Sequence, residues 1–200
     1  MTESTQQIII ITAPSGAGKT SITTHLLKTF SQLAFSVSAA TRLPRNNEQH
    51  AKDYYFMSEE EFQQKIQHNE FVEWEMVYEG KYYGTLKSEL KRIWDLQLIP
   101  ILDIDVKGAI HVQQQYPKTT LSIFIEPPSI TELKRRLDSR GTETDESLQA
   151  RINKAAYELS FKKSFSKTIV NANLLEARQQ AADIIRDFLH GQTHLKNIPN

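Results

Sequence analysis

A glycine-rich turn directly behind an apolar run is the feature that most constrains the fold of this chain. The isoleucines at 8–11 precede Ala-Pro-Ser-Gly-Ala-Gly-Lys-Thr at residues 13–20. A strand that feeds such a loop, with a helix behind it, is the Walker A or P-loop arrangement. The backbone N–H groups of the loop form a nest at a helix N-terminus, where the helix dipole favours negative charge. The motif therefore predicts an α/β fold with a site for phosphate groups.

Two side chains of the loop indicate which phosphates would bind there. Lys19 offers a cation to β- and γ-phosphates, and the Thr20 hydroxyl is suited to bind Mg²⁺. The pattern ordinarily begins with glycine, whereas this chain has Ala13 at that position. The loop predicts a nucleoside triphosphate site, and the alternative is a glycine-rich β–α turn without a ligand.

The composition limits the other classes of partner. The chain has 200 residues, which suit one globular unit, and Lys+Arg and Asp+Glu number 24 each. Because no net charge attracts the chain to nucleic acid or to a membrane, we expect neither partner. The absence of cysteine excludes disulfides, a thiol nucleophile and cysteine-bound zinc. The chain shows no signal-peptide pattern and no apolar run of about 20 residues, so we expect a cytoplasmic protein.

Apolar runs alternate with helical patterns, which is typical of a parallel sheet with helices on both faces. We therefore expect a three-layer P-loop fold. Capping boxes that start at Ser58 and Ser129 predict the beginnings of two helices, at 58–68 and 129–140. The other expected strands are 34–38, 71–77, 82–84, 98–105, 121–125 and 168–170, and the other expected helices are 19–30, 109–116 and 173–189.

The block at 38–88 interrupts this rhythm with short strands and many aromatic residues. We expect it to be an inserted, small mixed subdomain within a single domain. Gly141 opens a charged stretch, which we expect to belong to a helical lid. The expected division is a core at 1–37, 89–135 and 166–190, the subdomain at 38–88, the lid at 136–165 and a frayed polar tail at 191–200.

The apolar stretch at 98–105 ends in two acids, Asp103 and Asp105. In open α/β sheets, ligands bind beyond the carboxyl ends of the strands. We expect Asp103 to hold Mg²⁺ through water, and Asp105 to point to the opposite face because side chains alternate along a strand. The alternative is a strand end that carries solvated acids.

Arginines gather on segments that flank these motifs. Arg42 and Arg45 follow the strand expected at 34–38. Arg136 and Arg140 lie four residues apart on one helix face, and Arg151 follows. Because guanidinium groups bind phosphate oxygens bidentately and keep their charge, this cluster indicates more than one phosphate group. The alternative for any single arginine is a solvated position on a helix face.

Several further segments form an ordered set of motifs along the chain. They are Val37-Ser-Ala-Ala-Thr-Arg-Leu-Pro-Arg45, Asp53-Tyr-Tyr-Phe56, Phe71-Val-Glu-Trp74, Tyr82-Tyr-Gly-Thr85, Ile101-Leu-Asp-Ile-Asp105, Leu137-Asp-Ser-Arg-Gly-Thr-Glu-Thr144 and Ile169-Val-Asn171. In this order the segments resemble the guanylate kinase family. The resemblance runs from about residue 8 to 188, and ordered motifs are far more specific than a P-loop alone.

This resemblance implies transfer of the γ-phosphoryl of ATP to GMP, and to dGMP, with Mg²⁺ bound near Thr20 and Asp103. It implies that the residues acting on the transferred phosphoryl are Lys19, Arg42, Arg136, Arg140 and Arg151. It implies ATP contacts from Ala13, Pro14, Ser15, Gly16, Ala17, Gly18, Lys19, Thr20 and Ser21, with Asn171 beside the adenine. It implies that the GMP phosphate is held by Arg42, Arg45, Tyr54 and Tyr83, and that guanine is surrounded by Ser38, Glu73, Thr85 and Asp105.

The sequence departs from the family pattern at three alanines. Ala13 replaces the usual first glycine of the loop, and Ala40 stands where threonine is common. Ala172 stands where the family often has aspartate, which bears on the adenine pocket.

Glu73 gives the implied base preference a physical basis. Guanine offers N1–H and N2–H₂ side by side, and one carboxylate accepts both hydrogen bonds. Adenine presents a lone pair at N1, so the carboxylate would lose a bond and reject it. The alternative is that Glu73 is an exposed strand residue.

Two other functions remain open. A related P-loop kinase would act on AMP or dTMP. A non-catalytic guanylate-kinase-like module would bind peptides, and it would need neither Lys19, Thr20 nor the lid arginines. We expect an enzyme that acts on ATP and GMP as a monomer or a homodimer.

Overall fold

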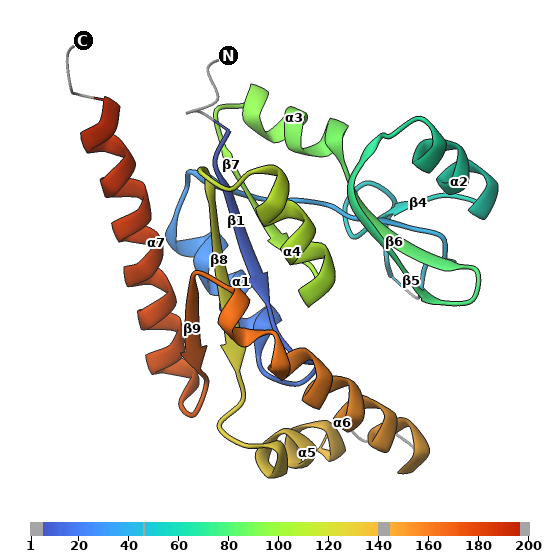
Figure 1. Ribbon diagram of the computed structural model, residues 1–200, viewed down its shortest axis with the longest axis vertical. Helices are drawn as coiled ribbons and strands as arrows, with labels where there is room; N and C mark the ends of the chain where they lie inside the picture. The colour runs from blue at the N-terminus through green and yellow to red at the C-terminus, as the bar shows by residue number, and fades with distance from the viewer. Residues whose placement is uncertain (1–5, 46, 140–144, 197–200) are drawn as a thin grey trace. The chain divides into compact units, whose positions relative to one another are not determined.

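The computed structural model describes residues 6–45, 47–139 and 145–196. Among these residues, contacts define two compact units: 6–10 with the described part of 32–120, and 11–31 with the described part of 121–196. Strand β1 (Ile8–Thr12), whose residues are all buried, belongs in part to each unit. Five strands form one sheet in the order β2-β7-β1-β8-β9 (Figure 1). The expected α/β class with a parallel sheet is therefore confirmed.

The first unit contains the elements between residues 32 and 120. Its strand β2 pairs in parallel with β7, and Leu33 lies opposite Ile99. The elements are β2 (Leu33–Phe35), β3 (Ala39–Ala40), β4 (Tyr55–Phe56), α2 (Glu59–Gln67), β5 (Phe71–Tyr78), β6 (Lys81–Leu86), α3 (Lys87–Asp95), β7 (Ile99–Asp103) and α4 (Val106–Gln115).

A second sheet lies within residues 38–88, the block that we expect to be an insertion. Its strand order is β4-β3-β6-β5, and it is mixed because β3 runs parallel to β4 and antiparallel to β6. Helix α2 buries Phe62 against this sheet, and the Phe62 and Phe71 rings stack with centroids 4.3 Å apart. Ala39 and Leu86 complete this small separate core.

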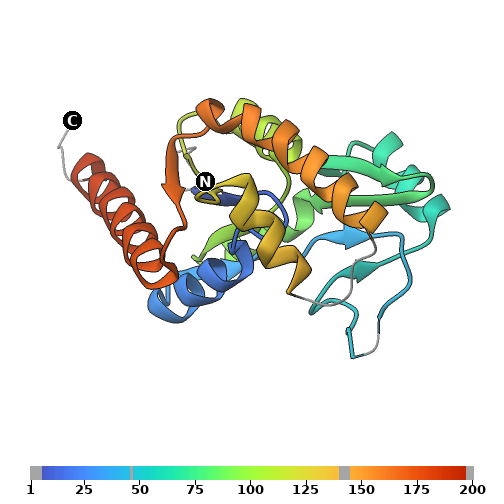
Figure 2. The ribbon, with the colours of Figure 1, turned by 90° about the horizontal axis from the view of Figure 1, so that it is seen from below.

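The second unit holds the segment after β1 and the C-terminal part of the chain. Helices α1 and α7 pack side by side (Figure 2). Helices α5 and α6 pack through Leu133, Leu137, Leu148 and Ala155. The elements are α1 (Lys19–Thr29), β8 (Thr120–Glu126), α5 (Ile130–Asp138), α6 (Asp145–Ser160), the 3₁₀ helix η2 (Lys162–Ser164), β9 (Lys167–Val170) and α7 (Leu174–Lys196).

The strand expected at 34–38 is two strands of different sheets. β2 ends at Phe35 and β3 begins at Ala39. Between them, the Ser36 N–H donates to the carbonyl of Ile101, and the Val37 N–H donates to a carboxylate on α3, each at 3.0 Å. The chain changes sheets at this point because its backbone is bound by partners on either side.

Helices begin where predicted when a side chain caps them. The Ser58 hydroxyl accepts from the Glu61 N–H at the start of α2, and the Ser129 hydroxyl caps α5 in the same way. Helix α3 escaped prediction because its N-cap, Leu86, has no side-chain oxygen. Helix α7 continues to Lys196, beyond the end expected at 189.

Over the residues that the structure describes, no helix combines the length and the apolar character that a membrane span requires.

Candidate functional site

The turn between β1 and α1 has the backbone of an anion-binding nest. Gly16 and Gly18 have positive φ angles of 90° and 100°, and the Ala17 N–H donates to the Pro14 carbonyl at 3.0 Å. Gly18 is the N-cap of α1 and supplies no side-chain cap. The turn therefore presents N–H groups at a helix N-terminus, which is the geometry that phosphate groups favour.

Ala13 fits this turn without backbone strain. Its side chain is buried, and its φ lies outside the left-handed region, so no glycine is needed there. Within the turn, Ser15 and Thr20 are exposed, and Lys19 and Ser21 are half-buried. The P-loop residues named by the sequence thus lie together at one helix end.

Side chains from three further segments reach this turn or its neighbour. Arg151, on α6, donates to the Ser15 hydroxyl at 3.0 Å. Asn171, just after β9, donates from Nδ2 to the carbonyl of Ala17 at 2.7 Å. Arg136, on α5, donates to the backbone carbonyl of Asn171 at 3.0 Å. The structure therefore brings Arg151 and Asn171 to the P-loop and Arg136 to Asn171, whereas Arg140 lies outside the described residues.

A second cluster of predicted residues forms in the first unit around Arg42. The Arg42 guanidinium carbon lies 4.8 Å from the ring centroid of Tyr54 and 5.5 Å from that of Phe56. The rings of Tyr54 and Tyr83 meet edge to face, with centroids 6.0 Å apart. Arg45 is exposed on the same loop. Cation–π contact and aromatic packing hold the guanidinium in one orientation.

Glu48 is the partner of this arginine, and sequence reasoning missed it. Its carboxylate accepts from both Nη atoms of Arg42, at 2.5 and 2.7 Å, and from the N–H of Arg45 at 2.7 Å. Hydrogen bonding with Arg42 lowers the pKa of Glu48 to about 2 and raises the pKa of Arg42 above its usual value. The only available signal is an acid three residues after Arg45 in a polar loop.

Glu73 is buried, so its alternative as an exposed strand residue is wrong. Its side chain lies on β5, where the residue is 6% exposed, and its Oε1 accepts a 2.6 Å hydrogen bond from the Thr85 hydroxyl on β6. Burial, together with the charges of Asp105 and Glu75, raises the pKa of Glu73 to about 7 against the opposing effect of Thr85. This carboxyl is a buried hydrogen-bond acceptor whose pKa lies near neutral pH.

Of the two aspartates near the end of β7, Asp105 differs from the expectation. β7 ends at Asp103, and Asp105 is the N-cap of α4 rather than a strand residue. Its Oδ1 accepts from the N–H groups of Lys107 and Gly108, at 3.1 and 2.9 Å, so strand alternation does not set its direction.

Ser38, half-buried, lies just before β3, and its carbonyl accepts from the Tyr55 N–H.

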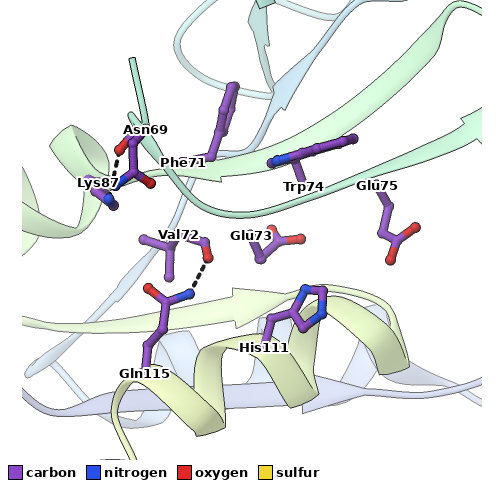
Figure 3. A pocket seen from close by; sticks show the side chains of 9 residues that line it. All are labelled: Asn69, Phe71, Val72, Glu73, Trp74, Glu75, Lys87, His111 and Gln115. Atoms are coloured by element: carbon purple, nitrogen blue, oxygen red, sulfur yellow. Dashed lines mark hydrogen bonds between the residues drawn. The ribbon is translucent and has the colours of Figure 1, made fainter. Parts of the chain in front are cut away.

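A pocket of about 500 Å³ lies along β5, between that strand and α4. Figure 3 shows Glu73 and Trp74 on the strand and His111 on the helix. Gln115 closes one side by donating to the Val72 carbonyl at 2.5 Å (Figure 3). Glu73 is therefore packed between its own sheet and a helix.

Comparison with known proteins identifies the family of this chain. The family model described as guanylate kinase matches residues 5–188. The guanylate kinase of Bacteroides fragilis is 45% identical over 183 residues, which cover 92% of this chain and 90% of that protein. The guanylate kinase of Porphyromonas gingivalis is 45% identical and covers 92% of this chain and 98% of its own length.

A solved structure extends the likeness to the backbone. The crystal structure of guanylate kinase from Anaplasma phagocytophilum superposes with a TM-score of 0.72 at 31% identity, covering 90% of this chain and 84% of that one. The matches span nearly the whole sequence, including both clusters described above. The chain therefore belongs to the guanylate kinase family.

Proposed function

We propose that this protein transfers the γ-phosphoryl group of ATP to GMP, and to dGMP, giving ADP and GDP or dGDP. The observation that carries the proposal is the buried Glu73 carboxyl, bound to Thr85 and close to the charge of Asp105. A buried acceptor of this kind selects guanine, because only guanine offers two adjacent N–H donors on its Watson–Crick edge. The relatives, which bear the name guanylate kinase, support the same acceptor and do not favour the non-catalytic binding module.

The acceptor phosphate would bind at the cluster around Arg42. Arg42 and Arg45 provide cationic donors, and the hydroxyls of Tyr54 and Tyr83 provide neutral ones. The Tyr54 and Tyr83 rings pack together, so their hydroxyls belong to one rigid group. At neutral pH the GMP phosphate, with a second pKa of about 6, is already largely dianionic, so attack needs no general base.

The donor phosphates would bind in the P-loop. Its backbone N–H groups and Lys19 would hold the phosphate chain, while Arg136, Arg140 and Arg151 would neutralise charge on the transferred group. Arg151 already contacts the P-loop residue Ser15. Catalysis then consists of positioning and charge neutralisation, with water excluded when both nucleotides are bound.

The donor set fits Mg²⁺ as the metal. Thr20 offers a hydroxyl and Asp103 a carboxylate, both hard oxygen ligands. In the part of the chain that the structure describes, no three or more histidine or acidic residues gather as a metal site. A magnesium ion that arrives on the nucleotide keeps its phosphate and water ligands, so it needs few ligands from the protein. When bound, the ion would neutralise charge on the phosphate oxygens.

A product analysis with a matched pair of lysine variants tests this proposal. Wild-type protein incubated with ATP, Mg²⁺ and GMP should form ADP and GDP in equal amounts. Lys19→Ala should lower the rate by about a thousandfold or more, because the donor phosphates lose their cation. Lys28→Ala, at the exposed last turn of the same helix, should turn over as the wild type does. ADP formed without GDP, or appreciable turnover by Lys19→Ala, would contradict the proposal.

A further inference from the structure

Asn171 lies beneath the P-loop rather than on its open side. The residue is 3% exposed, and its Nδ2 donates to the carbonyl of Ala17 at 2.7 Å. Its backbone is bound as well, since its N–H donates to the backbone carbonyl of Glu126 at 2.8 Å and its own carbonyl accepts from the Arg136 guanidinium at 3.0 Å. A residue bound at both backbone groups is a rigid support for its side chain.

The amide of Asn171 acts here as a donor. Ala17 presents a carbonyl oxygen, which can only accept, so the nitrogen of the amide must face it. The other end of the amide, Oδ1, is buried and has no hydrogen-bond partner among the described residues. An unpaired buried oxygen costs free energy. The hydrogen bond from Nδ2 to Ala17 is therefore the favourable interaction that the buried amide makes.

This bond fixes the direction of the next N–H group of the loop. No peptide bond in the described residues is cis, and in a trans peptide the C=O and the following N–H point in opposite directions. Holding the Ala17 oxygen against Asn171 therefore turns the Gly18 N–H away from it. If this peptide flipped, a carbonyl oxygen would replace the N–H donor and would repel a phosphate.

The close approach also explains why position 18 is glycine. Gly18 has a φ of 100°, and a Cβ built on it would lie 2.3 Å from Asn171 Nδ2. Any side chain there would push the asparagine away from Ala17. Gly18 and Asn171 thus form one device from segments far apart in the sequence.

We propose that Asn171 is a positioning residue, which orients the Ala17–Gly18 peptide so that the Gly18 N–H points at the donor phosphates. The inference rests on the proposed function in one respect, that the P-loop binds those phosphates. It differs from the role beside the adenine that the family resemblance implies, because the side-chain donor is already bound to Ala17. The side chain acts on phosphate binding through the backbone, whatever base the nucleotide carries.

Two ligands separate these roles. Dissociation constants are measured for ADP and for inorganic tripolyphosphate, which has phosphates but no base. Asn171→Ala should weaken both by about ten-fold, the loss expected for one misdirected hydrogen bond to a charged group. Asn171→Asp should weaken both further, because a carboxylate oxygen would face the Ala17 carbonyl. GMP affinity should stay within about two-fold of the wild type, which also shows that the variants are folded.

Asn173→Ala is the matched control. Asn173 lies two residues away, and its side chain caps α7 by accepting from the Leu175 and Glu176 N–H groups. Its loss should weaken that helix end but leave ADP and tripolyphosphate binding unchanged. A nonspecific effect of disturbing this segment would appear in both variants.

A direct readout comes from the sequence itself. The chain has seven glycines, and residues 17–18 form its only Ala–Gly step. Protein labelled with [1-¹³C]alanine and [¹⁵N]glycine therefore assigns the Gly18 amide by its carbon–nitrogen coupling. Tripolyphosphate should shift this amide proton downfield in the wild type and much less in Asn171→Ala.

The inference is overturned if Asn171→Ala weakens ADP but not tripolyphosphate, since the side chain then acts on the base. It is also overturned if neither affinity changes, or if GMP affinity falls equally. These outcomes are independent of the proposed acceptor, which the wild-type enzyme tests by its products alone.

Discussion

Glu73 is a buried carboxyl of the candidate acceptor site, and its surroundings raise its pKa. A helix approaches it so closely that a Cβ on Gly108 would lie 2.5 Å from its Oε2. Burial at this position raises its pKa to about 7. In the proposed contact with guanine the carboxyl must be ionised, because a protonated carboxyl loses one acceptor. Base binding should therefore be linked to loss of a proton near neutral pH.

The first prediction concerns this pH dependence. Because the pKa of Glu73 is raised to about 7, the carboxyl gains a proton as the pH falls through that value. The affinity for guanine should fall over the same pH range. Between pH 8 and pH 6 the dissociation constant of guanosine should rise by about ten-fold. Guanosine is the probe because it lacks the phosphate, which itself titrates near a pKa of about 6.

Glu73→Gln provides the control for that measurement. The amide cannot titrate, so its weaker guanosine binding should not vary with pH over the same range. A flat profile in the wild type would mean that Glu73 is ionised throughout or does not contact the base.

At the scale of the elements, α3 ends in a complete Schellman motif. Gln97, just past its C-cap, has a φ of 59°, and its N–H donates to the Trp94 carbonyl at 2.8 Å. The next N–H, from Leu98, donates to Ile93 at 3.1 Å. Glycine is the residue that this left-handed position favours.

The second prediction follows from that strained position. Gln97→Gly should raise the free energy of unfolding by about 0.5 to 1 kcal/mol, because glycine adopts a positive φ without a side-chain clash. The same substitution at Gln180, exposed inside α7, should lower it by about 1 kcal/mol. Urea unfolding of both variants checks the opposite signs, and equal signs would contradict the backbone explanation.

Glu89 joins three segments of the first unit. Its buried carboxylate accepts from the Val37 N–H, the Tyr55 hydroxyl and the guanidinium of Arg92. Burial alone would raise its pKa, but these hydrogen bonds hold it below the ordinary value. Glu89 therefore fixes the point at which the chain changes from one sheet to the other.

The third prediction compares this ion pair, in which the carboxylate is buried and the Arg92 side chain is 49% exposed, with an exposed pair of the same spacing. Glu89→Gln should lower the free energy of unfolding by about 2 to 3 kcal/mol, because Arg92 loses its charge partner and buried donors lose part of theirs. Asp183→Asn, which breaks the exposed pair with Arg186 in α7, should cost less than about 0.5 kcal/mol. Similar losses in the two variants would show that burial does not matter at Glu89.

The elements show which local signals the sequence carries. Helices α2 and α5 were predictable because Ser58 and Ser129 cap them through their own side chains. Helix α3 was not, because its start is fixed by tertiary contacts such as those of Glu89. The sequence predicts Asp105 on a strand, whereas the structure makes it the N-cap of α4. An apolar run followed by an acid has the same pattern in both cases.

At the scale of the whole molecule, the motifs predict the family, which is confirmed, and they name the residues of the candidate site, whose roles stay a prediction. Phosphate loops and arginine clusters are local patterns, and their order along the chain carries the resemblance. Glu48 could not be predicted because its role depends on how one loop folds back on Arg42. The hold of Asn171 on Ala17 likewise joins residues that only the tertiary fold brings together.

The identity of the acceptor nucleotide can be tested directly. ADP release from ATP and Mg²⁺ is measured in a coupled assay with GMP, dGMP, AMP, CMP, UMP and dTMP in turn. We predict strong turnover with GMP, turnover with dGMP, and little with the other four, because only guanine would satisfy the Glu73 carboxylate. Strong turnover with AMP and none with GMP would contradict it.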